Sequence, residues 1–329
     1  MKIKEGKTMK DYIIRRLLQM IPVFILLILL LFLIVELAPG DFVSGMINPR
    51  MTAEQKDALR EALGENRPFY VKFWNWLKEA VKGNLGYSQM YKKPVTEVIG
   101  SLLGSTFNLA ILSMIVSILI GIPTGILSAT KQYSILDNSL TVVSLIGISL
   151  PAFFFGLLVI KALAVDLQWF PIFGIQNHLL KTDNKFTIFL DKAWHLVLPV
   201  TVLGMSSAAS FMRYTRTSML EVIRQDYIRT ARSKGLKEKV VIYRHAFRNA
   251  MIPIITLIGF WIPSLLSGAV MTETVFGLPG MGRVMVDAAL KRDTQLVVGI
   301  NGMLALLTLI AAIIADILYA VVDPRVKYD

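Results

Sequence analysis

Long apolar segments alternate with shorter polar segments along most of this chain. The apolar runs contain few charged residues, and several reach the length of about 20 residues that a membrane-crossing helix needs. They lack the polar face that a surface helix of a soluble protein carries. The pattern therefore predicts an all-α integral membrane protein with six transmembrane helices, near residues 17–37, 106–128, 138–165, 195–212, 251–271 and 296–322.

Composition and charge support this prediction and give the chain an orientation. Apolar residues make up 54% of the chain and charged residues only 18%, whereas soluble domains carry about a quarter charged residues. The formal net charge is +12. If the amino terminus is cytoplasmic, nearly all of this positive excess falls in cytoplasmic segments, as the positive-inside rule requires. Both termini are then cytoplasmic, and no separate basic domain remains to bind nucleic acid.

The apolar runs also divide the chain into regions. Residues 1–16 form a basic cytoplasmic segment and residues 17–37 the first transmembrane helix. This helix is too long for the apolar core of a signal peptide and has no cleavage site after it. Residues 38–103 form an extracytoplasmic insertion. Residues 104–329 form a core of five transmembrane helices, with a cytoplasmic loop at 216–250.

The insertion carries signals for two helices. Thr52 and Gln55 have the spacing of a capping box, and Gly64 can end the helix that follows. Five aromatic residues then lie between Phe69 and Trp76. Aromatic residues favour the membrane interface, so we expect an amphipathic helix at the outer surface. Anchoring in membrane lipid is the simpler interpretation of this helix, and contact with a partner protein is the alternative.

Two of the later runs have unusual features. Pro151 lies in the middle of the run at 138–165, which predicts a kink because proline removes a backbone donor. The run at 195–212 is weakly apolar and carries a face of small residues, which allow helices to approach closely. We therefore expect this helix in the interior of the bundle. The small residues are Gly204, Ser206, Ser207, Ala208, Ala209 and Ser210.

The segment from Ser218 to Pro253 is the most distinctive polar stretch. Ten Lys or Arg residues lie between Arg213 and Arg248, against three acids. Its apolar residues follow three- and four-residue steps, which predicts one helical face, and Gly235 interrupts the pattern. Two short helices hinged at this glycine could dock a partner. The alternative is a solvated loop attracted to anionic lipid. The residues of the apolar face are Leu220, Ile223, Tyr227 and Ala231.

No recognisable catalytic or cofactor-binding pattern occurs in the chain. Phosphate-loop, zinc-protease and serine-hydrolase motifs are absent, and so is cysteine. The three histidines fall in different regions. Asp316 lies within the last run at a cost of about 2.5–3.5 kcal/mol, and we interpret it as a structural residue. A process driven by nucleotide would therefore need its nucleotide site on another chain.

Several stretches carry a family resemblance. Residues 226–235, DYIRTARSKG, and 244–253, RHAFRNAMIP, resemble the EAA loop of bacterial ABC-importer permeases. Ala231 and Gly235 match the general loop pattern. Arg229 replaces its usual Glu, as in the peptide branch, and Arg248 stands where Pro is common. The chain resembles the B-type permease of the dipeptide, oligopeptide and nickel branch. Other matching motifs are RRLL at 15–18, LAPGD at 37–41, GNLGY at 83–87, ISLP at 148–151, HLVLP at 195–199, TETVFG at 272–277 and DPR at 323–325.

This resemblance implies the fold of an ABC type I importer permease, a half-channel without cofactors of its own. Its expected partners are a second homologous permease, two ATP-binding subunits that carry ATP and Mg, and an extracytoplasmic peptide-binding protein. The expected ATPase-coupling residues are Leu220, Ile223, Asp226, Tyr227, Arg229, Thr230, Ala231, Lys234 and Gly235. Candidates for lining the substrate path are Ser206, Ser207, Ser210, Glu273 and Phe276.

Other interpretations remain open at this point. The turn with Gly277, Gly280 and Gly282 fits the outer mouth of a path and a compact connection equally well. A nickel importer of the same branch is the first functional alternative. Acids or histidines inside the membrane would favour a metal, and Asp316 is the one clear charge deep inside a run, so peptides are the favoured substrate. A stand-alone channel or secondary transporter would favour charges near the midplane or an internal repeat. A membrane enzyme would need a catalytic constellation.

Overall fold

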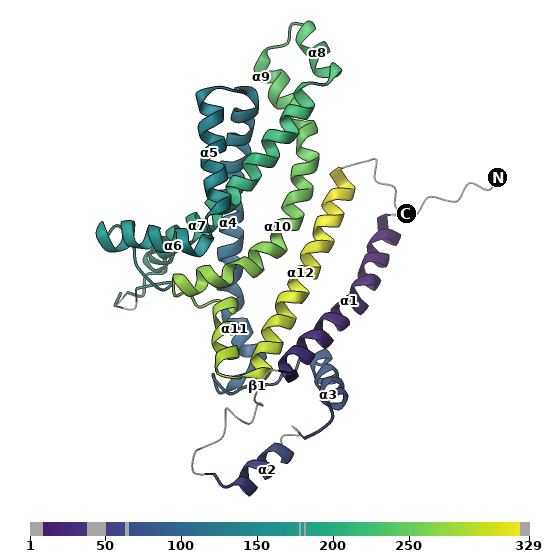
Figure 1. Ribbon diagram of the computed structural model, residues 1–329, viewed down its shortest axis with the longest axis vertical. Coiled ribbons are helices and arrows are strands. Elements are labelled where there is room, and N and C mark those ends of the chain that lie inside the picture. The colour runs from purple at the N-terminus through teal and green to yellow at the C-terminus, as the bar shows by residue number, and fades with distance from the viewer. Residues whose placement is uncertain (1–8, 38–50, 63–65, 178, 181, 323–329) are drawn as a thin grey trace, which may run out of the picture. The chain divides into compact units, whose positions relative to one another are not determined.

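The computed structural model describes residues 9–37, 51–62, 66–177, 179–180 and 182–322. Within these residues all the regular secondary structure is helical apart from one two-stranded antiparallel ribbon (Figure 1). It divides into two compact units. The first contains residues 107–278 and 311–322, and the second contains residues 9–106 and 279–310.

The second unit holds the amino-terminal helix and the insertion. Phe32 on α1 contacts the rings of Phe69, Phe73 and Trp76 on α3. Lys72 of α3 also forms an ion pair with Glu36 at 2.6 Å. One aromatic face of α3 therefore packs on α1. The elements are α1 (Met9–Leu37), α2 (Ala53–Ala62), α3 (Phe69–Val81), β1 (Tyr87–Ser88), β2 (Lys93–Pro94), α11 (Met281–Leu290) and the first parts of α4 (Val95–Thr130) and α12 (Thr294–Val322).

The helix signals of the insertion are confirmed. The amide of Thr52 donates to Gln55 Oε1 at 3.0 Å, and the amide of Gln55 donates to Thr52 Oγ1 at 3.3 Å, which forms the expected capping box before α2. Gly64 lies outside the described residues. The expected aromatic helix is α3, whose Tyr70 and Trp74 are exposed.

A buried carboxylate fastens the ribbon to the start of α12. Asp293 is 2% exposed, and it accepts hydrogen bonds from Ser88 Oγ at 2.6 Å and from the amide of Met90 at 2.9 Å. The starts of α4 and α12 then pack together through one apolar cluster. A Cβ at Gly299 would lie 2.5 Å from Val95 Cγ1, so only glycine permits this approach. The cluster includes Val95, Val98, Ile99, Leu102, Leu296 and Ile300.

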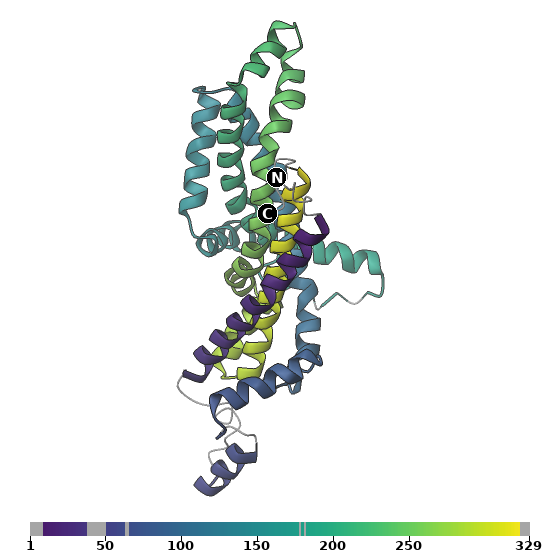
Figure 2. The ribbon, with the colours of Figure 1, turned by 90° about the vertical axis from the view of Figure 1, so that its right-hand side faces the viewer.

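The first unit is built around α7, which contacts α5, α6 and α10 (Figures 1 and 2). Ser207, Ala208 and Ala209 are buried on α7. A Cβ at Gly121 of α4 would lie 2.5 Å from Phe211 Cβ, which shows how closely α4 and α7 approach. The prediction that small residues place this helix inside the bundle is confirmed. The elements of the unit are the remainder of α4 and α12, α5 (Ile135–Ser149), α6 (Ala152–Val159), α7 (Lys185–Ile223), α8 (Asp226–Ser233), α9 (Glu238–Val240) and α10 (Arg248–Val275).

The kink at Pro151 is confirmed and is larger than a kink inside one helix. Leu150 leaves the helical region at ψ 125°, as residues before proline tend to do. Helix α5 ends there, and α6, extended by a π-helical segment at Ile160–Asp166, begins at an angle of 104°. The expected single helix at 138–165 is therefore two helices.

Four helices in the described part of the chain are long and apolar enough to cross a membrane, and the bent pair of α5 and α6 can supply a fifth crossing. The four correspond to the runs expected near 17–37, 106–128, 195–212 and 296–322. The run expected at 251–271 lies within the 28-residue helix α10. The structure thus supports four or five crossings directly, and six remains a prediction.

Candidate functional site

The segment from Ser218 to Pro253, called the basic segment below, begins in α7 and ends in α10. Between these helices it forms three short helical pieces at one end of the first unit (Figure 1). Helix α7 ends at Ile223, α8 and α9 follow, and a π-helical segment at Val241–Phe247 leads into α10. The prediction that the apolar residues of this segment share one helical face is wrong. The helix is interrupted at Gln225, whose backbone is extended at φ −73° and ψ 148°. This break leaves Leu220 and Ile223 on α7, while Tyr227 and Ala231 lie on α8.

The apolar side of α8 faces the protein's own core. Ile228 and Ala231 are buried, and they belong to one cluster with Met219, Val241 and Ala246. A neighbouring residue, Tyr227, is instead 45% exposed. The other exposed coupling candidates are Asp226, Arg229, Thr230, Lys234 and Gly235. The outer surface of α8 is therefore mainly polar, with Tyr227 as its aromatic contribution.

Gly235 ends α8 in the left-handed region, at φ 74°. Its amide donates to the Arg232 carbonyl at 2.9 Å, as in the glycine-based ends of many helices. Arg232 then donates two hydrogen bonds to Glu238, at 2.7 and 3.1 Å, across the turn. These bonds hold the pKa of the Glu238 carboxyl below its ordinary value. The turn occurs at the expected glycine, and an ion pair fixes the helices on its two sides.

Leu236 was not among the expected coupling residues. It follows Gly235 directly and is 41% exposed. Sequence periodicity could not assign it, because it lies between α8 and α9 rather than on a helical face. Together, Tyr227 and Leu236 give α8 and the following turn two exposed side chains with apolar area, and Tyr243 is a third exposed aromatic residue further along the segment.

A cavity of about 210 Å³ lies among α4, α5, α6 and α7 of the same unit. Ser206 is the one of the five expected path residues that lines it. Ser207 is buried within α7, and Ser210 is half-buried and does not line the cavity. The wall is otherwise almost entirely apolar, and its larger side chains include Ile120, Leu140, Val143, Phe155, Met205 and Met212.

The structure places Glu273 and Phe276 elsewhere. They are 0% and 3% exposed, so neither presents its side chain to an open surface. Phe276 belongs to a cluster with Leu109, Ile160 and Leu203. Its carbonyl also accepts a hydrogen bond from the amide of Gly174 at 3.0 Å. In this conformation the turn at 272–280 is a packed connection, which favours the compact-turn interpretation.

An ion pair between a partly buried arginine and a buried aspartate is the main feature that sequence reasoning missed. Asp137 is 1% exposed, and Arg216 donates to its two oxygens at 2.8 and 3.0 Å. In the sequence Asp137 stands directly before the apolar run expected at 138–165 and belongs to no motif. The two residues are 79 positions apart, so no local pattern connects them. Asp316, in contrast, is half-buried.

The polar side chains of the described residues offer no metal centre. No group of three or more His, Asp or Glu residues within them could hold a metal ion. His195 Nδ1 contacts the Asp191 carbonyl oxygen at 2.8 Å, and His245 lies on the separate 241–247 segment. His178 lies outside the described residues. The arrangement provides a helical bundle with an apolar cavity and a basic segment at one end.

These features define a helical membrane protein with an apolar cavity and a basic segment. Comparison with known proteins identifies its family. The chain belongs to the binding-protein-dependent transport system inner membrane components: residues 121–328 match that family, and residues 9–110 match its amino-terminal region. It is a multi-pass permease subunit of a bacterial ABC transporter, in which ATP hydrolysis belongs to separate subunits.

Relatives match the chain over nearly its whole length. The oligopeptide transport system permease protein AppB of Bacillus subtilis is 42% identical, with 97% of this chain and 100% of AppB covered. The dipeptide transport system permease protein DppB of Escherichia coli K12 is 36% identical, with 97% and 99% covered. The glutathione transport system permease protein GsiC of Escherichia coli O6:H1 is 35% identical, with 97% and 100% covered.

A solved structure shares the fold over part of this chain. In the inward-facing MetNI methionine ABC transporter, one chain superposes with a TM-score of 0.56 at 15% identity. The match covers 69% of this chain and 96% of that chain. At this identity the likeness concerns the fold alone, and it supports an ABC-importer permease fold for this chain.

Proposed function

We propose that this chain is one transmembrane half of an ATP-driven importer of peptides. Its full-length similarity to permeases named for oligopeptide and dipeptide transport is the observation that supports this best. The complete importer would contain a second homologous permease, two subunits that bind ATP and Mg, and an extracytoplasmic peptide-binding protein. The chain itself would cross the cytoplasmic membrane six times with both termini inside.

The peptide proposal has a direct test. The full complex is reconstituted in proteoliposomes with labelled di- and oligopeptides or with labelled Ni²⁺ as the offered solute. We expect ATP-dependent uptake of peptide and background levels of Ni²⁺, since the described residues contain no metal-binding group. Uptake of Ni²⁺ without uptake of peptide would assign the chain to the nickel alternative instead.

The coupling contact is proposed at the exposed surface of the basic segment. Because Ile228 and Ala231 are buried in the unit's own core, an ATPase would contact the outer residues of α8 and the following turn. Tyr227 and Leu236 supply apolar area, and the surrounding arginines and lysines orient the contact. The buried cluster beneath would pass a displacement of α8 to α7 and α10, because all three contribute residues to it.

A bulky substitution tests the role of the buried side of α8. Ala231→Phe should displace α8, since overpacking a filled site costs about 1–3 kcal/mol, and Ala231 is 6% exposed. We expect normal membrane insertion but fewer peptides transported per ATP hydrolysed. The matched control is Ser233→Phe, which places the same ring at an exposed position of the same helix. Equal transport per ATP in both variants and the native complex would contradict this account.

A further inference from the structure

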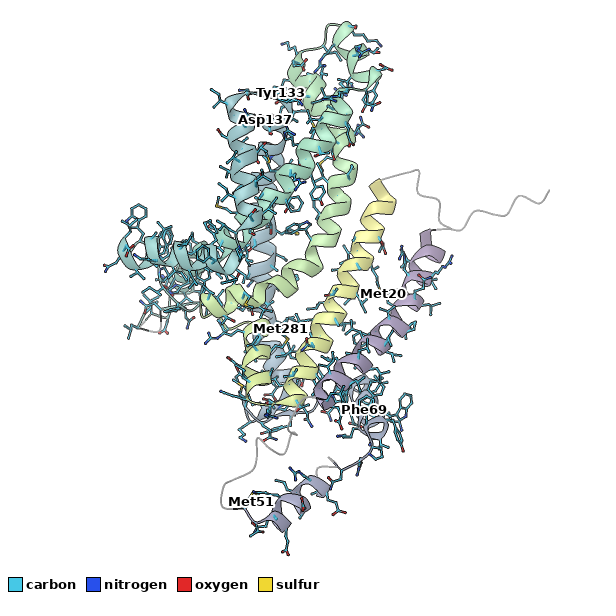
Figure 3. The ribbon with its side chains drawn as sticks, in the orientation of Figure 1. Met20, Met51, Phe69, Tyr133, Asp137 and Met281 are labelled. Carbon is cyan, nitrogen blue, oxygen red and sulfur yellow. The ribbon has the colours of Figure 1, made fainter. Side chains whose placement is uncertain are left out.

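Asp137 collects hydrogen bonds from three separate parts of the first unit. The side chain of Ser128 at the end of α4 donates to Oδ1, and the amide of Tyr133 in the following turn donates to Oδ2 at 2.9 Å. Arg216 of α7 supplies the remaining bonds through Nε and Nη2. Tyr133 holds a left-handed backbone at φ 62°, which is costly for an aromatic residue. Figure 3 shows Tyr133 and Asp137 at the start of α5.

This ion pair connects the two helices that contribute most of the cavity wall. Helix α5 provides Leu140 and Val143, and α7 provides Met205 and Met212. Asp137 precedes Leu140 by three residues, and Arg216 follows Met212 by four, so each charged residue lies about one helical turn beyond the wall. The pair therefore ties the two walls together at the same end of the cavity.

The tied end is also the end that leads to the basic segment. Helix α7 continues from Arg216 to Ile223, and only residues 224–225 separate it from α8. At its other end α5 stops at Leu150, where the chain turns by 104° into α6. Thus α5 ends in a sharp bend toward α6, and near its start it is joined to α7 by the Asp137–Arg216 ion pair.

We propose that Arg216 and Asp137 are positioning residues that make α5 follow α7 when the basic segment is displaced, and so set the width of the cavity. This inference rests on the proposed transport function. A buried ion pair is weak evidence for a stabilising role, because apolar residues of similar volume often serve a fold equally well. Its directional, two-bond geometry is suited to transmitting a movement between two helices.

The test removes both charges together in the complete reconstituted transporter. Asp137→Asn with Arg216→Gln leaves no unpaired buried charge, which is the damaging outcome of a single substitution. We expect an assembled complex with native ATP hydrolysis and about tenfold less peptide transported per ATP, within the usual range of coupling effects. The matched control is Lys161→Gln with Asp166→Asn, which removes an exposed ion pair of the same unit.

A distance measurement separates transmission from stability. The chain contains no cysteine, so spin labels can be placed at Leu145→Cys on α5 and Tyr214→Cys on α7, both exposed positions outside the cavity wall. With the Asp137–Arg216 ion pair intact, the distance between the two spin labels should stay narrowly distributed with and without a trapped ATP analogue. In the double variant it should broaden or shift between the two states, whereas in the control it should match the native chain.

Each outcome decides the proposal. Either native transport per ATP or an unchanged distance between the two spin labels in the assembled double variant would overturn it. If that variant does not assemble, Arg216→Lys provides the decision, because lysine keeps the charge and loses the two-bond geometry. Reduced transport per ATP in Arg216→Lys supports the proposal, and native transport overturns it. Absence of peptide transport by the native complex would instead contradict the proposed function.

Discussion

Gly235→Pro is expected to abolish ATP-coupled uptake while leaving the chain inserted in the membrane. Proline fixes φ near −65°, whereas Gly235 has a φ of 74° and uses its amide to bond Arg232. Proline at a position whose φ it cannot adopt and whose amide is hydrogen-bonded costs more than about 1 kcal/mol, which corresponds to at least a roughly fivefold loss of the native turn. The Arg232–Glu238 pair across the turn would be disrupted with it. The measurement is peptide uptake and ATP hydrolysis by the reconstituted complex.

Gly235→Asn is the matched control for this substitution. Asparagine adopts the left-handed conformation more readily than other residues with a side chain, and a Cβ at position 235 would meet nothing within 4 Å. We expect this variant to retain most of the coupled uptake. Normal uptake by Gly235→Pro would show that the native turn is not needed to transmit the ATPase movement.

The second prediction with a large expected effect concerns transport by this chain without its partner subunits. It has no phosphate-loop motif, and its family places ATP hydrolysis on separate subunits. The cavity of the first unit is small, and its wall is mainly apolar. We therefore expect the chain alone to insert into a bilayer and to transport no peptide, with or without ATP.

The sequence predicted those features that depend on neighbouring residues or on helical periodicity. The capping box of Thr52 and Gln55, the break at Pro151 and the left-handed end of α8 at Gly235 each follow from local backbone chemistry. The burial of Ser207, Ala208 and Ala209 follows from side-chain size. The long apolar runs predict the spanning helices because lipid leaves a helix few ways to satisfy its backbone.

Features that depend on tertiary packing were not predictable in this way. The face expected from Leu220 to Ala231 has the right spacing, but the backbone at Gln225 divides it between two helices. Phe276 is a sequence-based candidate for lining the substrate path, but its side chain is buried in a core cluster. The Asp137–Arg216 pair joins α5 to α7 across a long sequence separation. Such contacts can be predicted only when the packing of the helices against one another is known. The pattern of residues in a single sequence does not specify that packing.

Reconstitution with and without the ATPase subunits tests the central claim. This claim is that the chain forms half of the translocation path and changes conformation only when separate ATPase subunits hydrolyse ATP. Proteoliposomes would contain this chain and its partner permease, with binding protein and labelled peptide outside, and either both ATPase subunits or none. Uptake that requires ATPase subunits and ATP is the result we predict. ATP-independent peptide uptake in the absence of those subunits would contradict the claim.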